Sequence, residues 1–184
     1  MIIVKTLLAD LQRHYYYSGR KDYMPGIGKL FLNMFNPRFL PVVFCRLAHS
    51  LYKCRLTPLA RLISLQNFVL FGIEIAMRCE IGKGLYFPHT VGTVIGAQRI
   101  GCNAVIYHGV TFGAKEIDLG YADNLRPVVG DNVVVGSGAK VLGGISIGDN
   151  AVIGANAVVI EYVPPGMVAG GVPAKIIGPR QKQD

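Results

Sequence analysis

The amino-acid sequence predicts a mainly β protein: a parallel β-helix with an α-helical appendage at its N-terminus. From Val129 to Val159 an aliphatic residue returns every six residues, and glycine follows it at four of these six positions. A period of six fits neither an amphipathic helix nor a long strand, but it fits coils of three hexads, each a short strand and a corner. Asparagine also recurs where the chain must turn sharply, often at positive φ. The recurring asparagines are Asn132, Asn150 and Asn156.

The first 74 residues show helix signals instead of hexads. A first helix is expected from Ile2 to Tyr17, ended by Ser18 and Gly19. A helix that starts near Asn36-Pro37 places its apolar residues 40, 43, 44, 47 and 51 on one stripe. Another starts at Thr57-Pro58 and is expected to end at Gly72. We expect residues 1–74 to cap one end of the coils, because an open end would expose core and edge strands.

The hexads of the predicted β-helix extend over residues 75–178. They begin near Ile75, and one step, from Phe87 to Val94, is seven residues long. Val94 is therefore expected to point into the interior of the coils. Residues 113–127 lack the pattern and hold four charged residues before Arg126. This segment therefore predicts a loop extruded from one corner of the coils. Insertions in repeat arrays lie on the surface and often mark a binding face. Residues 179–184 form a basic tail.

The net charge of +8 is concentrated in the N-terminal region. Residues 1–74 hold ten Lys and Arg against three Asp and Glu, and no acidic residue lies between Asp22 and Glu74. One interpretation is a solvated basic face. The other is that residues 23–73 make a peripheral contact with an anionic membrane surface or attract an anionic substrate. No nucleic-acid module is visible, so no nucleic-acid partner is predicted.

The sequence shows no recognisable targeting signal, which favours a cytoplasmic protein. No apolar run is long enough to predict a spanning helix, and no cleavage site follows the first apolar stretch, which Asp10 interrupts. The four cysteines show no CxxC spacing, which predicts free thiols in a reducing compartment. The expected location is cytoplasmic, and the basic region adds the alternative of a peripheral position at the inner membrane face.

Two of the four histidines lie at equivalent positions of the hexads. His89 and His108 are each the third residue of a hexad, so they are expected at the same corner of successive coils, about 4.8 Å apart. The loop at residues 113–127 is expected to leave a corner of the next coil, near these histidines. A neutral histidine there suits general-base catalysis. The alternatives are two surface residues without a role, or a metal site. No metal is predicted, because zinc sites use three or four protein ligands and no third histidine or cysteine cluster lies in the coils.

The sequence at this point resembles a known family. The hexads, the loop and the ending Pro164-Pro165-Gly166 through Val172-Pro173-Ala174-Lys175 resemble the hexapeptide-repeat acyltransferases. Within them, the serine acetyltransferases and their polysaccharide-modifying relatives are the most similar branch. The resemblance covers about residues 75–178 and implies a left-handed coil, a homotrimer, acetyl-CoA as co-substrate and active sites between neighbouring subunits.

The resemblance also implies roles for individual residues. The run from Tyr86 to Gly92 is similar to the family segment that holds the catalytic histidine, so His89 takes the role of general base. The residues implied on the acceptor side are His108, Asn124 and Arg126. The residues implied for acetyl-CoA are Gly113, Ala114, Ala139 and Ala157, with Lys175 near the phosphates.

Departures from the family pattern shape the expected acceptor. Serine acetyltransferases carry Asp before the catalytic histidine and Asp-Arg-His-Pro at the loop end, where this chain has Pro88 and Asn124-Leu125-Arg126-Pro127. Leu125 cannot pair with an amino-acid carboxylate, and the helical region is shorter and more basic than that of the serine enzymes. We therefore expect O-acetylation of a sugar, surface polysaccharide or lipid-linked glycan. The alternatives are serine O-acetylation in cysteine biosynthesis, N-acetylation of an amino sugar, and a scaffold without enzyme activity.

Overall fold

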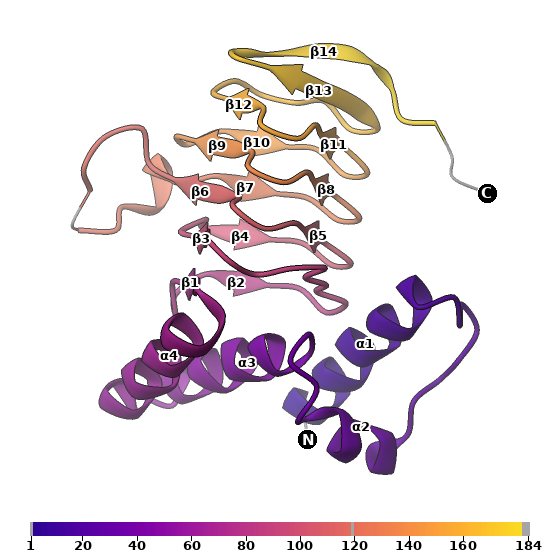
Figure 1. Cartoon of the computed structure of the whole chain (residues 1–184). Helices are drawn as coiled ribbons and strands as arrows, with labels where there is room; N and C mark the ends of the chain where they lie inside the picture. Colours follow the sequence, from indigo (N-terminus) through magenta and orange to yellow (C-terminus); the bar gives the residue numbers. More distant parts are fainter. Residues whose placement is uncertain (1, 119, 182–184) are drawn as a thin grey trace.

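The computed structural model describes residues 2–118 and 120–181 and shows a stack of β-coils standing on a layer of helices (Figure 1). Leu119 of the predicted loop and residues 182–184 of the predicted basic tail lie outside the described residues. The helices are α1 (Ile2–Tyr17), α2 (Ile27–Asn33), α3 (Leu40–Lys53) and α4 (Thr57–Phe71). The predicted end of α4 is confirmed, because Gly72 adopts a left-handed φ of 61° that a residue with a side chain rarely takes.

The strands form three sheets, and the chain visits the sheets in turn. The first sheet contains β1 (Ile73–Ile75), β3 (Thr93–Ile95), β6 (Thr111–Gly113), β9 (Lys140–Leu142) and β12 (Val158–Val159). The second contains β2 (Glu80–Ile81), β4 (Arg99–Ile100), β7 (Val128–Val129) and β10 (Ser146–Ile147). The third contains β5 (Val105–Ile106), β8 (Val134–Val135), β11 (Val152–Ile153), β13 (Met167–Gly171) and β14 (Ala174–Pro179). The pairs are parallel except for the β13–β14 hairpin, so the predicted left-handed parallel β-helix is confirmed.

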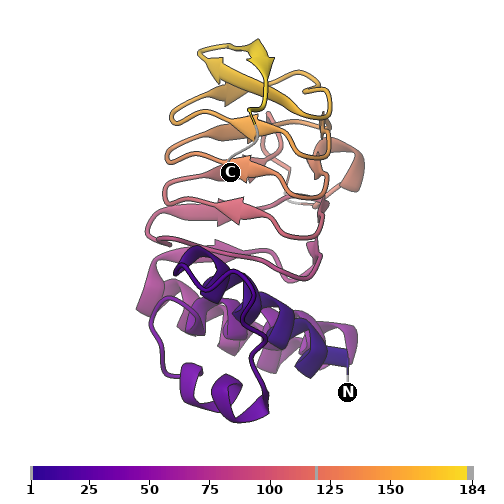
Figure 2. The ribbon, with the colours of Figure 1, turned by 90° about the vertical axis from the view of Figure 1, so that its right-hand side faces the viewer.

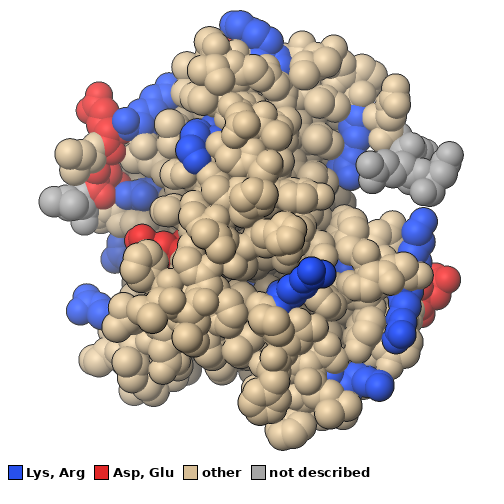
Figure 3. All heavy atoms as spheres, viewed as in Figure 1, with Lys and Arg blue, Asp and Glu red and all other residues tan. Residues whose placement is uncertain are grey.

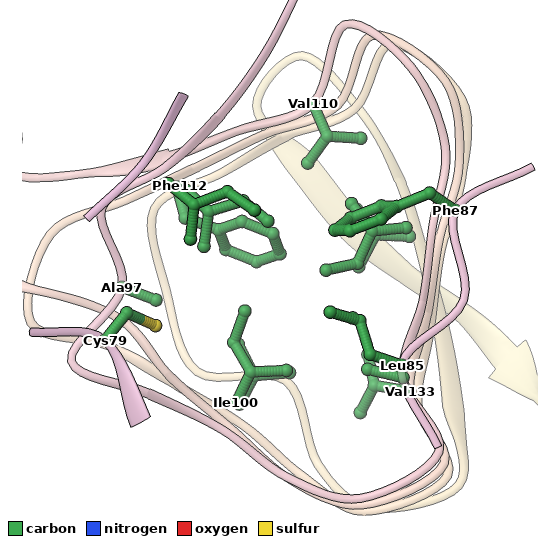
Figure 4. Close-up of a cluster of buried hydrophobic side chains, with 14 of the residues drawn as sticks. Cys79, Leu85, Phe87, Ala97, Ile100, Val110, Phe112 and Val133 are labelled. Carbon is green, nitrogen blue, oxygen red and sulfur yellow. The ribbon is translucent and has the colours of Figure 1, made fainter. Parts of the chain in front are cut away.

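The interior of the coils is a narrow triangular core. Figure 4 shows buried side chains from all three sides pointing inward, among them Phe87, Ile100 and Phe112. The recurring asparagines have positive φ at the corners, as expected; Asn132 adopts 56°. The prediction for Val94 is wrong. Thr93 and Ile95 are buried in its place, because the corner after Phe87 is longer than a seven-residue step allows, and Val94 is 37% exposed.

A buried ion pair attaches the helices to the first coil. Asp10 of α1 accepts hydrogen bonds of 2.9 and 3.0 Å from Arg46 of α3. The same carboxylate accepts from the backbone N–H groups of Gly84 and Leu85 in the coil, at 2.7 and 2.9 Å. Arg46 also donates to two carbonyl oxygens of that coil. This network fixes the helices against the end of the stack, where Figure 2 shows α1 lying across it.

No helix in the described part of the chain is both long and apolar enough to cross a membrane.

Candidate active site

The two predicted histidines meet at one corner of the coils. His89 and His108 are exposed where the third sheet turns into the first, and their ring centroids are 5.7 Å apart with the planes at 83°. Gly109 makes the turn after His108 with a left-handed φ of 69°, which favours glycine there. The structure therefore brings together two imidazoles that solvent and a ligand can reach.

Small residues continue this corner toward the C-terminus. Ile106 pairs with Val135, Val135 with Ile153, and Ile153 with Ala169, so the residues two positions further on follow one another along the stack. We call this line the histidine edge; it comprises His89, His108, Ser137, Ala155 and Gly171. Its small side chains leave room for a thin ligand to lie against the coils. Ser137 and Ala155 were not predicted from the sequence, although both are third residues of hexads like the histidines.

Lys140 was also missed. It lies on β9 in the first sheet, and its ammonium donates a hydrogen bond to the carbonyl oxygen of Gly109. This contact places a positive charge beside the corner that carries His108. The sequence offered no signal for it beyond the outward position of a lysine in a strand.

The residues expected to bind acetyl-CoA divide into two groups. Lys175 pairs with Gly170 in the β13–β14 hairpin, at the end of the histidine edge. Ala139 and Ala157 lie just past that edge, but both residues are fully buried and their backbone groups are paired within the coils, so neither faces a ligand directly. Gly113 and Ala114 lie at the opposite end of the strands of the first sheet, since Gly113 pairs with Leu142, the last residue of β9. A single chain does not gather all five.

The loop at residues 113–127 leaves from that opposite end and folds on itself. The loop is therefore one strand away from the histidines, not beside them as expected from the sequence. Arg126 donates a 2.9 Å hydrogen bond to the carboxylate of Asp118, which holds the pKa of Asp118 below its usual range. The Arg126 guanidinium lies 4.0 Å from the ring centroid of Tyr121.

Tyr121 in turn attaches the loop to the coil. Its hydroxyl donates to the carbonyl oxygen of Ala97 at 3.0 Å, and burial raises its pKa to about 12. Because the phenol stays protonated, it remains a donor at neutral pH. Asn124 and Leu125, in a 3₁₀ turn (Asp123–Leu125), are left exposed to solvent. The side chain of Arg126 is thus engaged within the loop, whereas Asn124 faces outward from it.

Within residues 2–118 and 120–181, no group of three His, Cys, Asp or Glu side chains is placed so that it could hold a metal ion.

Comparisons with known proteins identify the class of this fold and site. The model of the family described as "Bacterial transferase hexapeptide (six repeats)" matches residues 126–161. The serine acetyltransferase of Mycobacterium tuberculosis is 41% identical over an alignment of 156 residues, and the match covers 79% of this chain and 67% of the relative. The crystal structure of the Neisseria gonorrhoeae serine acetyltransferase matches with a TM-score of 0.84 and 32% identity, over 98% of this chain and 68% of that one.

A structure with a bound cofactor is also similar. It is the Brucella abortus serine acetyltransferase in complex with coenzyme A, which matches with a TM-score of 0.81 and 29% identity, over 98% of this chain and 69% of that chain. The chain is therefore a hexapeptide-repeat transferase that uses acetyl-CoA. Within that class, it belongs to the serine acetyltransferase family. It spans about two thirds of the length of these three relatives.

The prediction of a sugar or polysaccharide hydroxyl as acceptor is wrong, and so is the implied role in polysaccharide biosynthesis. The matching relatives are serine acetyltransferases, at 41% identity for the M. tuberculosis protein. The prediction gave too much weight to Pro88 and Leu125, two positions on the acceptor side. It also counted the shorter, more basic helical region as a departure from the family, but the N. gonorrhoeae structure matches 98% of this chain, so the helices have counterparts there.

Proposed function

We propose that this chain transfers the acetyl group of acetyl-CoA to the hydroxyl of L-serine, releasing CoA and forming O-acetylserine. The observation that carries the proposal is the exposed His89–His108 pair at the start of the histidine edge, in a chain whose relatives are serine acetyltransferases. The paired imidazoles supply a proton acceptor that functions near neutral pH.

In the proposed reaction His89 is the general base. It removes the hydroxyl proton of serine as that oxygen attacks the thioester carbon. The carbon–sulfur bond breaks, and the thiolate of CoA leaves and takes the proton from His89. His108, edge-on to His89, orients the ring or contacts the acceptor. The acceptor's carboxylate needs a cation, and Lys140 beside Gly109 is a candidate that lies close to the histidines.

The division of the expected cofactor residues supports a site shared between subunits of a homotrimer. Acetyl-CoA would lie along the histidine edge of one subunit, with Lys175 near its phosphates and the buried Ala139 and Ala157 in the core behind that edge. The loop of a neighbouring subunit would supply Gly113 and Ala114 to the cofactor. The same loop would bring Asn124 to the acceptor, with Arg126 holding its shape through Asp118.

We also propose a cytoplasmic location for this reaction. All four cysteines are free, and Cys45 and Cys79 are buried, an arrangement that suits a reducing compartment.

An acceptor panel tests the proposed function. The purified full chain is incubated with acetyl-CoA, and thiol release is followed with L-serine, L-threonine, glucosamine, neutral sugars or no acceptor. We expect serine to give the highest kcat/KM, and mass spectrometry to find the acetyl group on its hydroxyl oxygen. Faster release with glucosamine and an N-acetylated product would instead establish amino-sugar acetylation. No release above the acceptor-free rate with any compound would favour a scaffold without enzyme activity.

A further inference from the structure

The imidazole of His89 has little to hold it within one chain. Its ring lies edge-on to the ring of His108, and among the described residues it forms no hydrogen bond and no ion pair. The ion pairs of the described residues all involve lysine or arginine, and the acidic side chains visible in Figure 3 lie toward the left and right edges of that face. A general base must lie within hydrogen-bond reach of the proton that it removes. The position of the ring therefore depends on the backbone of its own corner, residues 88–92.

This corner lies between the end of α4 and the next coil. On one side, the N–H group of Gly92 donates a 2.9 Å hydrogen bond to the carbonyl oxygen of Gly72, the residue that ends α4. On the other side, the carbonyl oxygen of Val91 accepts a 3.0 Å hydrogen bond from the N–H group of Gly109. Both bonds hold the backbone two and three positions after His89, and neither holds the residue next to it.

The side chain of Thr90 supplies a contact at that adjacent position. Its hydroxyl donates a 2.9 Å hydrogen bond to the carbonyl oxygen of Phe71, the last residue of α4. The last four carbonyl oxygens of a helix have no partner within the helix, so this one is available as an acceptor. A β-branched side chain has few rotamers, and the bond therefore restrains the backbone beside His89.

We propose that Thr90 is a positioning residue for His89. Its bond to the end of α4 holds the corner so that the imidazole meets the hydroxyl of the acceptor, and Thr90 itself does not contact the reacting atoms. This inference deepens the proposed function and rests on it, since it assigns Thr90 to the general base named there. It also gives the helical region a part in catalysis, because Phe71 and Gly72 at the end of α4 accept the two bonds.

Removing the hydroxyl tests the proposal in the full chain. Thr90→Val keeps the shape of the side chain and loses the donor, and it should lower kcat about 10- to 100-fold, because a misplacement of about 1 Å can cost about 100-fold. The KM for acetyl-CoA should stay at the wild-type value, because the proposal gives Thr90 no contact with the cofactor. The matched control, Thr90→Ser, keeps the hydroxyl and should retain most of the wild-type kcat. If Thr90→Val does not fold, Thr90→Ala removes the same donor with less crowding.

A double variant shows whether Thr90 acts through His89. Residues that act as a unit have effects that do not add. Thr90→Val should therefore cause no further loss of the residual rate in the His89→Ala background. Urea unfolding of each variant separates a change in stability from a change in turnover.

Nuclear magnetic resonance of the histidine rings gives a readout that needs no acceptor. The Hε1 signal of His89 is assigned by its absence in His89→Ala. It is expected to shift or broaden in Thr90→Val and to stay in place in Thr90→Ser, because only the first variant frees the corner. This comparison holds whether or not serine is the acceptor.

Three results would overturn the role of Thr90. The first is a Thr90→Val variant with wild-type kcat and an unchanged His89 signal, and the second is an equal loss of kcat in Thr90→Val and Thr90→Ser. The third is a further loss when Thr90→Val is added to His89→Ala. A wild type that releases no thiol with any acceptor would instead contradict the proposed function, and the resonance comparison would still decide whether Thr90 positions His89.

Discussion

Two histidines show how burial decides what the same side chain does. His89 is exposed at a corner with His108 beside it, which leaves its nitrogens free for an acceptor. His14 is buried between the rings of Phe39 and Tyr86, and its Nδ1 has no hydrogen-bond partner among the described residues. Burial, assisted by the charge of Arg38, lowers the pKa of His14. One imidazole is available for chemistry, and the other fills space.

The role of His89 predicts the behaviour of His89→Ala. Because the side chain lies outside the core, the variant should fold with wild-type stability but lose about 10²–10⁴-fold in kcat, the usual range for a general base. The measurement is thiol release with saturating acetyl-CoA and serine, alongside thermal unfolding. A folded variant with near wild-type turnover would remove His89 from the mechanism.

The burial of His14 predicts a pH effect on stability. Its folded-state pKa lies below the usual value of 6.5, so as pH falls below 6.5 the unfolded state takes up the proton first. The free energy of unfolding should therefore decrease until the folded-state pKa is reached. His14→Phe should remove this contribution, by about 1.4 kcal/mol for each unit of pKa shift.

Urea unfolding of both proteins at about pH 7.5 and pH 5.5 measures this difference, since the two pH values bracket the unfolded-state titration of histidine. An identical pH dependence in the variant and the wild type would show that His14 does not contribute.

At the scale of elements, the sequence predicted periodic structure well and long-range contacts poorly. The hexads located the coils and the interrupted segment located the loop, because a residue that must fill the narrow core recurs at a fixed spacing. The same spacing failed at Val94, where the corner that carries His89 is longer. Asp10 read only as an interruption of an apolar stretch, and its partner Arg46 is 36 residues away. Pairings of that kind have no local sequence signal.

The Asp10–Arg46 pair predicts a large effect on stability. Arg46→Leu leaves a carboxylate buried without its charge partner, which typically costs about 3–5 kcal/mol. The matched control is Lys53→Leu, which breaks a pair between α3 and Glu80 whose side chains are more than half exposed, and should cost at most about 1 kcal/mol. Urea unfolding of both variants makes the comparison. Equal, small effects would show that the buried pair does not attach the helices to the coils.

At the scale of the whole molecule, the strands of the first sheet separate the histidine edge from the loop. The histidine edge precedes these strands and the loop follows β6. The fold class followed from the sequence because the repeat fixes both strand length and corner position. The acceptor did not, because Pro88 and Leu125 differ from the family pattern in a chain that otherwise matches serine acetyltransferases throughout. In the proposed shared site, Pro88 and Leu125 of one chain belong to two different active sites, so together they do not describe one acceptor site.

The shared site predicts both the assembly and a complementation result. Light scattering should give a mass about three times the 19.9 kDa of the chain. Gly113→Trp should block the cofactor without disturbing its own chain, since a Cβ at Gly113 meets nothing within 4 Å. Mixed oligomers of His89→Ala and Gly113→Trp should regain activity that neither variant has alone, because some sites combine an intact His89 with an intact Gly113. A fully active monomer, or no recovery on mixing, would contradict a shared site.

The value of kcat/KM for L-serine, measured by CoA release with the acetylated product identified, tests the central claim most directly. The account predicts O-acetylserine as the product and a value of about 10⁴ M⁻¹s⁻¹ or more, the lower end of the ordinary enzyme range. It also predicts that His89→Ala lowers this value while the protein remains folded. A value for serine no higher than the acceptor-free background, with rapid CoA release to another acceptor, would contradict the assignment.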